Sequence, residues 1–229
     1  MSAKRLAMVY TGAEVLLRSQ SHLIRGKRVG VITNHSAVLR DGTHLVDALL
    51  SQKDVHVVAL FGPEHGIRGQ APDRKSIRDE LDTKTGVPIF SLFGKTTKPT
   101  SQMLEGIDVL AFDIQDVGSR FYTYTTTLAL TLEAAAEKGI PYVVLDRPNP
   151  IGGLHTEGPI REESLKSFVG WLPFPIMHGL TIGEIALMIA GERWLRRRVR
   201  PLLHVVNMRG WRRNLFFDET NLPWISPSP

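Results

Sequence analysis

Carboxylate side chains follow two apolar runs of this 229-residue sequence. Glu64 stands in Pro63-Glu64-His65-Gly66, directly after the run 55–61, and Asp113 and Asp116 stand around the end of the run 109–114. The proline restrains the backbone beside Glu64, and the final glycine permits close approach of a substrate. Glycoside hydrolysis uses two carboxyl groups about 5 to 9.5 Å apart that flank the scissile bond. We therefore predict Glu64 as a catalytic carboxylate and Asp113 or Asp116 as its partner.

Further polar residues follow the other apolar runs. In an open parallel sheet the ligand crevice lies beyond the carboxyl ends of the strands, so side chains that follow different strands should meet at one rim. Asp and Asn also cap helices that follow strands, so each of them can have a purely structural role instead. As a set, we predict that they bind substrate. The set is Asn34, His65, Gln115, Asp146, Arg147 and Asn149.

The segment 120–124, Arg-Phe-Tyr-Thr-Tyr, adds a cation and two phenol rings to the same rim. Arg120 can fork onto a carboxylate of substrate or protein, and Arg68 or Arg120 is the alternative ion-pair partner for Glu64. Tyr122 and Tyr124 can stack on sugar faces, or can simply begin the next helix half-buried. His178 precedes a later helix, where it can place an imidazole in the cleft or serve as a hydrogen-bonded structural histidine.

Other chemistries lack their sequence signature. The first apolar run is not followed by Gly-x-Gly-x-x-Gly, and the chain has no Gly-x-x-x-x-Gly-Lys-Ser/Thr, no Gly-x-Ser-x-Gly and no cysteine. Dinucleotide binding, phosphate binding and acyl-enzyme chemistry are therefore not expected, and no cofactor is predicted. A metal-dependent hydrolase that uses His65, Asp113 and His178 is the alternative to carboxylate chemistry.

Short apolar runs rich in β-branched residues alternate with segments at helical spacing. Strands buried on both faces and separated by helices are typical of right-handed βαβ units. We predict an α/β fold with a Rossmann-like, mainly parallel sheet, flanking helices and a Gly- and Pro-rich crossover over 151–175. The predicted strands are 28–33, 55–61, 89–93, 109–114, 142–145 and 202–207, and the predicted helices are 43–50, 124–138 and 181–194.

Composition sets bounds on location and partners. The chain is 42% hydrophobic with a net charge of +5, and no recognised nucleic-acid motif accompanies the basic run 193–200, so no nucleic-acid partner is predicted. Neither a secretory leader nor a bilayer-spanning run is visible, which predicts a cytoplasmic protein, or an extracellular or periplasmic one if a leader is missing. We expect a Rossmann-like subdomain over 1–200 and the start of a truncated second subdomain over 201–229.

Four motifs stand in order along the chain. They are Gly-Lys-Arg-Val-Gly-Val-Ile-Thr-Asn-His-Ser (26–36), Phe-Gly-Pro-Glu-His-Gly-Ile-Arg-Gly (61–69), Phe-Asp-Ile-Gln-Asp-Val-Gly-Ser-Arg-Phe-Tyr-Thr-Tyr (112–124) and Asp-Arg-Pro-Asn-Pro (146–150). These motifs resemble the NamZ-type exo-β-N-acetylmuramidases, long catalogued as a domain of unknown function. The resemblance covers nearly all of the chain from Thr11 onward.

The resemblance implies an enzyme that removes N-acetylmuramic acid from the non-reducing end of peptidoglycan fragments in cell-wall turnover. It implies an active site in a cleft between a Rossmann-like subdomain and a second one, with Glu64 catalytic and Asp113 or Asp116 as its partner. A substrate acetamido nucleophile is an alternative mechanism. Arg68, Arg120 or Arg147 is expected to bind the lactyl carboxylate.

Relatives run past the segment 222–229, so an N-terminal portion of a longer protein is expected. A muropeptide- or sugar-binding module without turnover is the competing class of protein.

Overall fold

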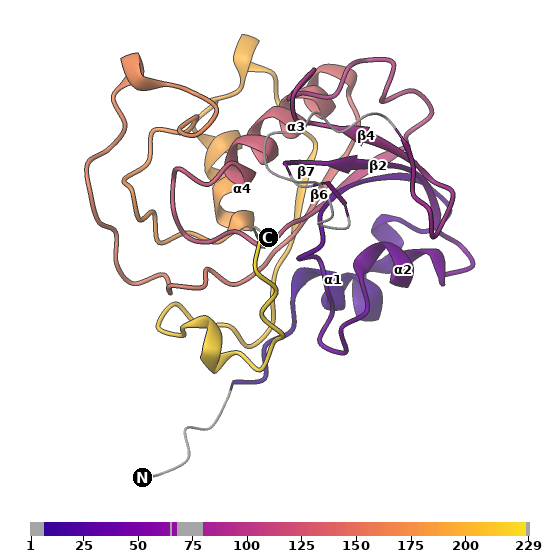
Figure 1. Ribbon diagram of the computed structural model, residues 1–229, viewed down its shortest axis with the longest axis horizontal. Helices are drawn as coiled ribbons and strands as arrows, with labels where there is room; N and C mark the ends of the chain where they lie inside the picture. Colours follow the sequence, from indigo (N-terminus) through magenta and orange to yellow (C-terminus); the bar gives the residue numbers. More distant parts are fainter. Residues whose placement is uncertain (1–6, 65, 68–79, 228–229) are drawn as a thin grey trace.

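The computed structural model describes residues 7–64, 66–67 and 80–227, and within them a seven-stranded sheet forms the centre of the molecule (Figure 1). Its order is β3-β4-β2-β1-β5-β6-β7. Neighbouring strands are parallel except for the edge strand β3, which pairs antiparallel with β4. The strands are β1 (Arg28–Thr33), β2 (His56–Gly62), β3 (Glu80–Leu81), β4 (Pro88–Ser91), β5 (Val109–Asp113), β6 (Tyr142–Leu145) and β7 (Leu203–Val206).

Helices cover both faces of the sheet and give the molecule three layers (Figure 1). One face carries α1 and α2, and the other carries α3 and α4. The helices are α1 (Gly12–Val15), α2 (Leu45–Leu50), α3 (Tyr124–Lys138) and α4 (Ile182–Gly191). The short turns are η1 (Leu16–Gln20), which is π-helical and continues α1, and the 3-10 turns η2 (Ser21–Leu23), η3 (Glu163–Leu165), η4 (Arg196–Arg198) and η5 (Phe217–Glu219).

The central strand β1 is buried on both faces because its side chains alternate between two apolar cores. Val29 and Val31 pack in the core under α1 and α2, and Ile32 packs in the core under α3 and α4. A Cβ at Gly30 would lie 2.8 Å from a side-chain atom of Leu110. The glycine therefore lets the core under α3 and α4 approach the strand. Packing on both sides explains why the strand reads as a continuous apolar run.

The ends of the two longer helices follow local signals. The helix α3 ends at Gly139, whose φ of 68° is in the left-handed region that glycine adopts without strain. The helix α4 begins with a capping box, in which Thr181 accepts a hydrogen bond from the Glu184 amide and the Glu184 carboxylate accepts one from the Thr181 amide. It ends at Gly191, before Arg193 with a left-handed φ of 58°.

The predicted mainly parallel α/β fold is confirmed, and its strands and helices lie within a few residues of the predicted ranges. The elements that were not predicted are the helical segment 12–23, the two-residue strand β3 and the 3-10 turns η3, η4 and η5. The strand β7, which lies just past residue 200, pairs in parallel with β6 and so belongs to the same layer, and the subdomain boundary at residue 200 stays a prediction. Within the described residues, no helix combines the length and apolar character needed to cross a bilayer.

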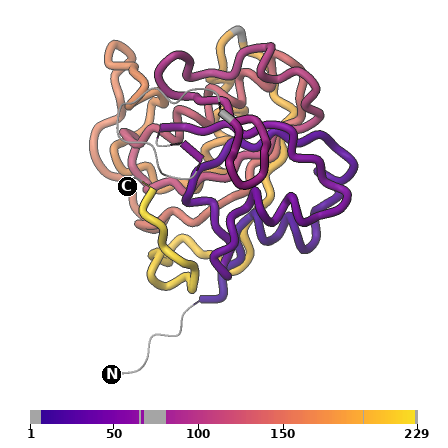
Figure 2. Tube along the Cα trace, turned by 45° about the vertical axis from the view of Figure 1, so that its right-hand side comes forward, coloured from indigo at the N-terminus to yellow at the C-terminus, as the bar shows by residue number. Residues whose placement is uncertain are grey.

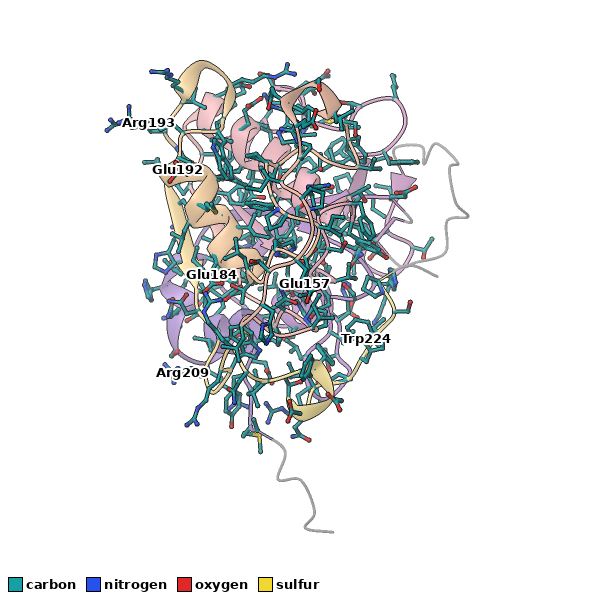
Figure 3. The ribbon with its side chains drawn as sticks, turned by 90° about the vertical axis from the view of Figure 1, so that its left-hand side faces the viewer. Glu157, Glu184, Glu192, Arg193, Arg209 and Trp224 are labelled. Carbon is teal, nitrogen blue, oxygen red and sulfur yellow. The ribbon has the colours of Figure 1, made fainter. Side chains whose placement is uncertain are left out.

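The first described residues lie beside the segment 209–220 (Figures 1 and 2). The amide of Ala7 donates to the carbonyl of Glu219 at 2.7 Å, and Tyr10 and Arg209 exchange two backbone hydrogen bonds. Figure 3 shows Arg209 and Trp224 in the lower half of the molecule in that view. The C-terminal segment is thus fixed against the sheet layer.

Candidate active site at the carboxyl edge of the sheet

Parallel strands deliver polar residues to one edge of the sheet. The strand β1 leads to Asn34, β2 to Glu64, β5 to Asp116 and β6 to Asp146. Because β1 lies between β2 and β5 and pairs with both in parallel, these strands end beside one another. The described residues of the predicted set therefore lie along one rim of the molecule.

Asp113 forms a buried ion pair with Arg147. The Nε and Nη2 atoms of Arg147 donate to the two carboxylate oxygens, with 3.0 Å from Nη2 to Oδ2, and Nη2 also donates to the carbonyl of Val38. Both side chains are buried. The guanidinium holds both oxygens, so Asp113 is engaged within the protein, and its catalytic role stays a prediction. The same pair engages Arg147, whose role in substrate binding also stays a prediction.

Asp116 lies in the loop after β5, buried beside His178. Its Oδ2 accepts a hydrogen bond from the amide of Gly118 at 2.8 Å and lies 3.2 Å from Nε2 of His178, without the alignment of a hydrogen bond. The Nδ1 of His178 accepts from the amide of Leu180, so a neutral imidazole carries its proton on Nε2. Oδ1 of Asp116 has no hydrogen-bond partner among the described residues. One carboxylate oxygen is thus fixed, and the other is buried without a hydrogen bond to any described residue.

The hydroxyl of Tyr124 is buried at the same edge as the two remaining carboxylates. Burial raises the pKa of Tyr124 far above its ordinary value, and the Tyr122 hydroxyl and the charges of Glu64 and Asp116 raise it further, while a hydrogen bond with the Asn34 side chain lowers it. The charges of Glu64 and Asp116 therefore both act on this hydroxyl. The ring of Tyr122 stands edge-on to that of Tyr124 with centroids 5.1 Å apart.

Buried polar atoms without a partner are concentrated at this edge. Such atoms are rare in folded proteins, because burying them unpaired costs free energy. Here they lie in the loops after β1 and β5 and just before α4, and some are donors while others are acceptors. The atoms that have no hydrogen bond with any described residue are His35 Nδ1, Gln115 Oε1, Asp116 Oδ1, Ser119 Oγ and His178 Nε2. A ligand rich in hydroxyl and amide groups would satisfy this set.

Other predicted binding residues are engaged within the protein. Asp146 accepts two hydrogen bonds from the start of α4 and one from the amide of Arg147. Asn149 joins the loop after β6 to the loop before α4, and Arg120 donates to two carbonyls of the crossover loop. The Nε2 of Gln115 also donates to two backbone carbonyls. These side chains hold the loops in place, and only Gln115 among the four has a buried polar atom left unpaired.

His65 and Arg68 lie outside the described residues, so their predicted roles stay predictions. The metal alternative is weakened by geometry, because both oxygens of its proposed ligand Asp113 bind Arg147. Within the described ranges, no three His, Asp or Glu side chains converge as a metal site requires.

His35 belongs to this edge, although it was not among the predicted substrate-binding residues. Its Nε2 lies 2.7 Å from the carbonyl of Ser226, which can only accept, so Nε2 is the donor, and Nδ1 is buried without a hydrogen bond to any described residue. Its position directly after Asn34 at the end of β1 was the available signal. The C-terminal segment that supplies the carbonyl could not be placed from sequence, since 191 residues separate the two partners.

The fold and this edge define an α/β protein with a carboxylate-based site at the carboxyl ends of parallel strands. The chain belongs to the family described as "Exo-beta-N-acetylmuramidase NamZ, N-terminal", whose model matches residues 29–229. The resemblance drawn from the four sequence motifs is thereby confirmed.

Known proteins support this assignment. Over 221 residues the chain is 50% identical to "Peptidoglycan beta-N-acetylmuramidase NamZ" of Bacillus subtilis (strain 168), covering 96% of this chain and 52% of the relative. A solved DUF1343 family protein of Bacteroides fragilis superposes with a TM-score of 0.91 at 45% identity, covering 99% of this chain and 56% of that one. A second gives a TM-score of 0.80 at 39% identity, with coverages of 91% and 54%. The chain spans about half the length of the relatives it matches.

Proposed function

We propose that the protein containing this chain is a glycosidase that releases N-acetylmuramic acid from the non-reducing end of peptidoglycan fragments. Family membership and the printed activity of the Bacillus subtilis relative support the substrate class. The observation that carries the proposal is the pair of carboxylates at the carboxyl edge, with Glu64 after β2 and Asp116 after β5, whose charges both act on the Tyr124 hydroxyl. Two carboxylates at one site are the usual requirement of glycosidic bond cleavage.

In this proposal Glu64 is the general acid that protonates the leaving-group oxygen. It is half-buried, directly after β2, in a turn closed by the hydrogen bond from the Gly66 amide to the Pro63 carbonyl. Asp116 is the second carboxylate: its Oδ2 is held by Gly118, so Oδ1 is aimed by the loop rather than by the substrate. A carboxylate whose orientation is fixed in advance loses less entropy when it acts.

The remaining open polar groups would position the sugar. His178 and His35 offer ring nitrogens around the carboxylates, and they suit the hydroxyl and acetamido groups of an amino sugar. Of the arginines proposed for the lactyl carboxylate, Arg147 is committed to Asp113, which leaves Arg120 and Arg68 as candidates.

The test is the hydrolysis of a β-linked N-acetylmuramic acid–N-acetylglucosamine disaccharide by the natural polypeptide that contains these 229 residues. Glu64→Gln keeps the shape and removes the proton donor, so kcat should fall by at least about a hundredfold. Glu105→Gln, at an exposed position away from the edge, is the control and should retain full activity. A fully active Glu64→Gln protein would remove Glu64 from the catalytic role. Binding of the disaccharide by the unaltered protein without any product would instead indicate a sugar-binding module.

A further inference from the structure

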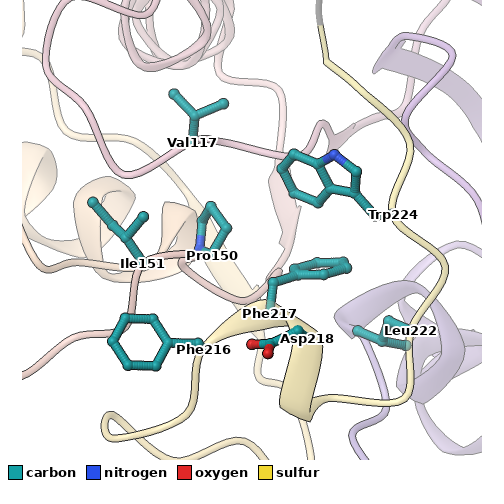
Figure 4. A pocket seen from close by; sticks show the side chains of 8 residues that line it. All are labelled: Val117, Pro150, Ile151, Phe216, Phe217, Asp218, Leu222 and Trp224. Atoms are coloured by element: carbon teal, nitrogen blue, oxygen red, sulfur yellow. The ribbon is translucent and has the colours of Figure 1, made fainter.

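An apolar cavity of about 680 Å³ opens beside the candidate site (Figure 4). Its walls come from three segments: the loop after β5, the loop after β6, and the C-terminal segment around η5. The size is within the range of small-molecule sites in proteins. The lining residues are Val117, Pro150, Ile151, Phe216, Phe217, Asp218, Leu222 and Trp224.

The cavity and the carboxylate site share their walls. Val117, in the cavity, directly follows Asp116 in the loop after β5. Trp224 lies three positions before Pro227, whose carbonyl accepts a hydrogen bond from the Tyr124 hydroxyl. The amide of Phe217 donates to the carbonyl of Pro150 at 3.0 Å, which fixes the C-terminal wall to the loop after β6. A molecule bound at the carboxylates can therefore extend into the cavity.

Aromatic rings form much of the cavity wall. Phe217 and Trp224 meet edge to face with centroids 4.8 Å apart, and this contact holds the indole in place. Trp224 is 48% exposed and Phe216 is 53% exposed, so neither ring is buried in the protein core. Figure 4 shows the indole of Trp224 and the ring of Phe217 on the same side of the cavity. Rigid exposed rings of this kind suit the apolar C–H face of a pyranose ring.

The charge of the cavity selects among the sugars of the proposed substrate. Asp218 is an exposed carboxylate, and among the described residues that line the cavity none is a cation. N-acetylmuramic acid carries a lactyl carboxylate, which Asp218 would repel and nothing in this lining would pair with. The neighbouring amino sugar of peptidoglycan is uncharged, and its hydroxyl groups can donate to Asp218.

From these walls and this charge we infer that the cavity is the subsite for the uncharged N-acetylated hexosamine on the leaving-group side of the scissile bond. The inference rests on the proposed function, which places N-acetylmuramic acid at the carboxylates. Trp224 is the residue that would carry most of the contact, because its ring is both exposed and held.

The test compares two substrates that differ only in their leaving group. The disaccharide places a hexosamine in the cavity, whereas N-acetylmuramyl β-fluoride has no leaving-group sugar. For Trp224→Ala in the natural polypeptide, kcat/KM for the disaccharide should fall about 5- to 10-fold, the loss expected for one aromatic contact. With the fluoride, kcat/KM should change less than about twofold. Trp224→Phe keeps an aromatic face and should recover most of the loss.

Leu154→Ala is the matched control, since Leu154 is a large exposed apolar residue that does not line the cavity. Equal losses on both substrates would show that Trp224 supports the site as a whole and would overturn the inference, as would no loss on the disaccharide. If the unaltered protein cleaves neither substrate, the proposed function fails, and saturation-transfer NMR with free N-acetylglucosamine still decides the subsite. A signal that Trp224→Ala abolishes supports hexosamine binding, and no signal from the unaltered protein overturns it.

Discussion

At the scale of single residues, two arginine–carboxylate pairs with similar geometry stand in opposite environments. Arg147 and Asp113 have side chains that are 5% and 0% exposed, whereas Arg28 and Asp108 are 55% and 40% exposed. Each arginine donates through Nε and Nη2 to both oxygens of its partner. Water screens the exposed pair and replaces a lost partner, but it cannot do so for the buried one.

We therefore predict a large difference between two equivalent substitutions. Arg147→Leu leaves the Asp113 carboxylate buried without its counter-ion and should lower the free energy of unfolding by about 3 to 5 kcal/mol. Arg28→Leu, the control at the exposed pair, should cause a much smaller loss. Urea unfolding followed by circular dichroism measures both. Equal losses would show that the buried pair is not a main support of the carboxyl edge.

The pair of Arg147 with Asp113 is a feature that the sequence could not predict. The acidic pattern after β5 predicted that Asp113 or Asp116 would act with Glu64, but it could not choose between them. The choice depends on the Arg147 side chain, 34 residues later, which folds back onto Asp113 and leaves Asp116 beside His178. Strand ends can be predicted from local pattern, whereas the pairing of side chains from different loops depends on tertiary packing.

At the scale of elements, Asp146 joins the end of β6 to the start of α4. Its Oδ1 accepts from the amides of Gly183 and Arg147, and its Oδ2 accepts from the hydroxyl of Thr181. Burial raises the pKa of Asp146 to about 6, although these hydrogen bonds oppose the shift. A carboxyl group whose pKa is higher in the folded state stabilises the fold at low pH, and that stabilisation is lost as the pH rises through the folded pKa.

Asp146→Asn should therefore change the pH dependence of stability in a defined direction. The amide stays neutral, so the stability of the variant relative to the unaltered protein should rise between about pH 4 and pH 7, by up to about 3 kcal/mol. Thermal unfolding across this range measures the difference.

Asp108→Asn is the control with the opposite sign. Hydrogen bonds from Arg28 lower the pKa of Asp108 to about 2, so its contribution is present above about pH 4 and is lost as the pH falls. The relative stability of that variant should fall as the pH rises through this lower window. A pH-independent difference for Asp146→Asn would show that its carboxyl group has the same pKa in both states.

Elements with strong periodic patterns were predicted well, and elements defined by contacts were not. The helix α3 and strand β6 begin and end as predicted because an Ala- and Leu-rich run ends at a glycine and a β-branched run follows it. The helix α1 was not predicted, because a glycine at position 12 lowers the helix propensity of the segment. A Cβ at this position would lie 2.2 Å from the Asp146 amide, so the glycine is required by close packing against the end of β6.

At the scale of the whole molecule, the C-terminal segment closes one side of the carboxyl edge. It is held by the N-terminal segment through Ala7 and Tyr10, and by the site itself through two carbonyls. The carbonyl of Ser226 accepts from His35, and that of Pro227 accepts from Tyr124. Because the raised pKa of Tyr124 keeps its hydroxyl protonated, the tyrosine remains a donor at any physiological pH. The wall of the cavity and the carboxylate site are thus joined by hydrogen bonds rather than by apolar packing alone.

Removing the hydroxyl should loosen this segment without unfolding the molecule. In Tyr124→Phe, exchange of the hydrogen-bonded amides in 217–220 should become about 5- to 10-fold faster, as expected for the loss of one hydrogen bond worth about 1 kcal/mol. Tyr142→Phe is the matched control, because its buried hydroxyl pairs with Thr131 between β6 and α3, away from the segment. That variant should lose global stability, while the exchange rates in 217–220 keep their ratio to those of the rest of the chain. If Tyr124→Phe instead raises exchange equally in the sheet and in 217–220, the tyrosine supports the core, and the segment is held by its contacts with residues 7–10.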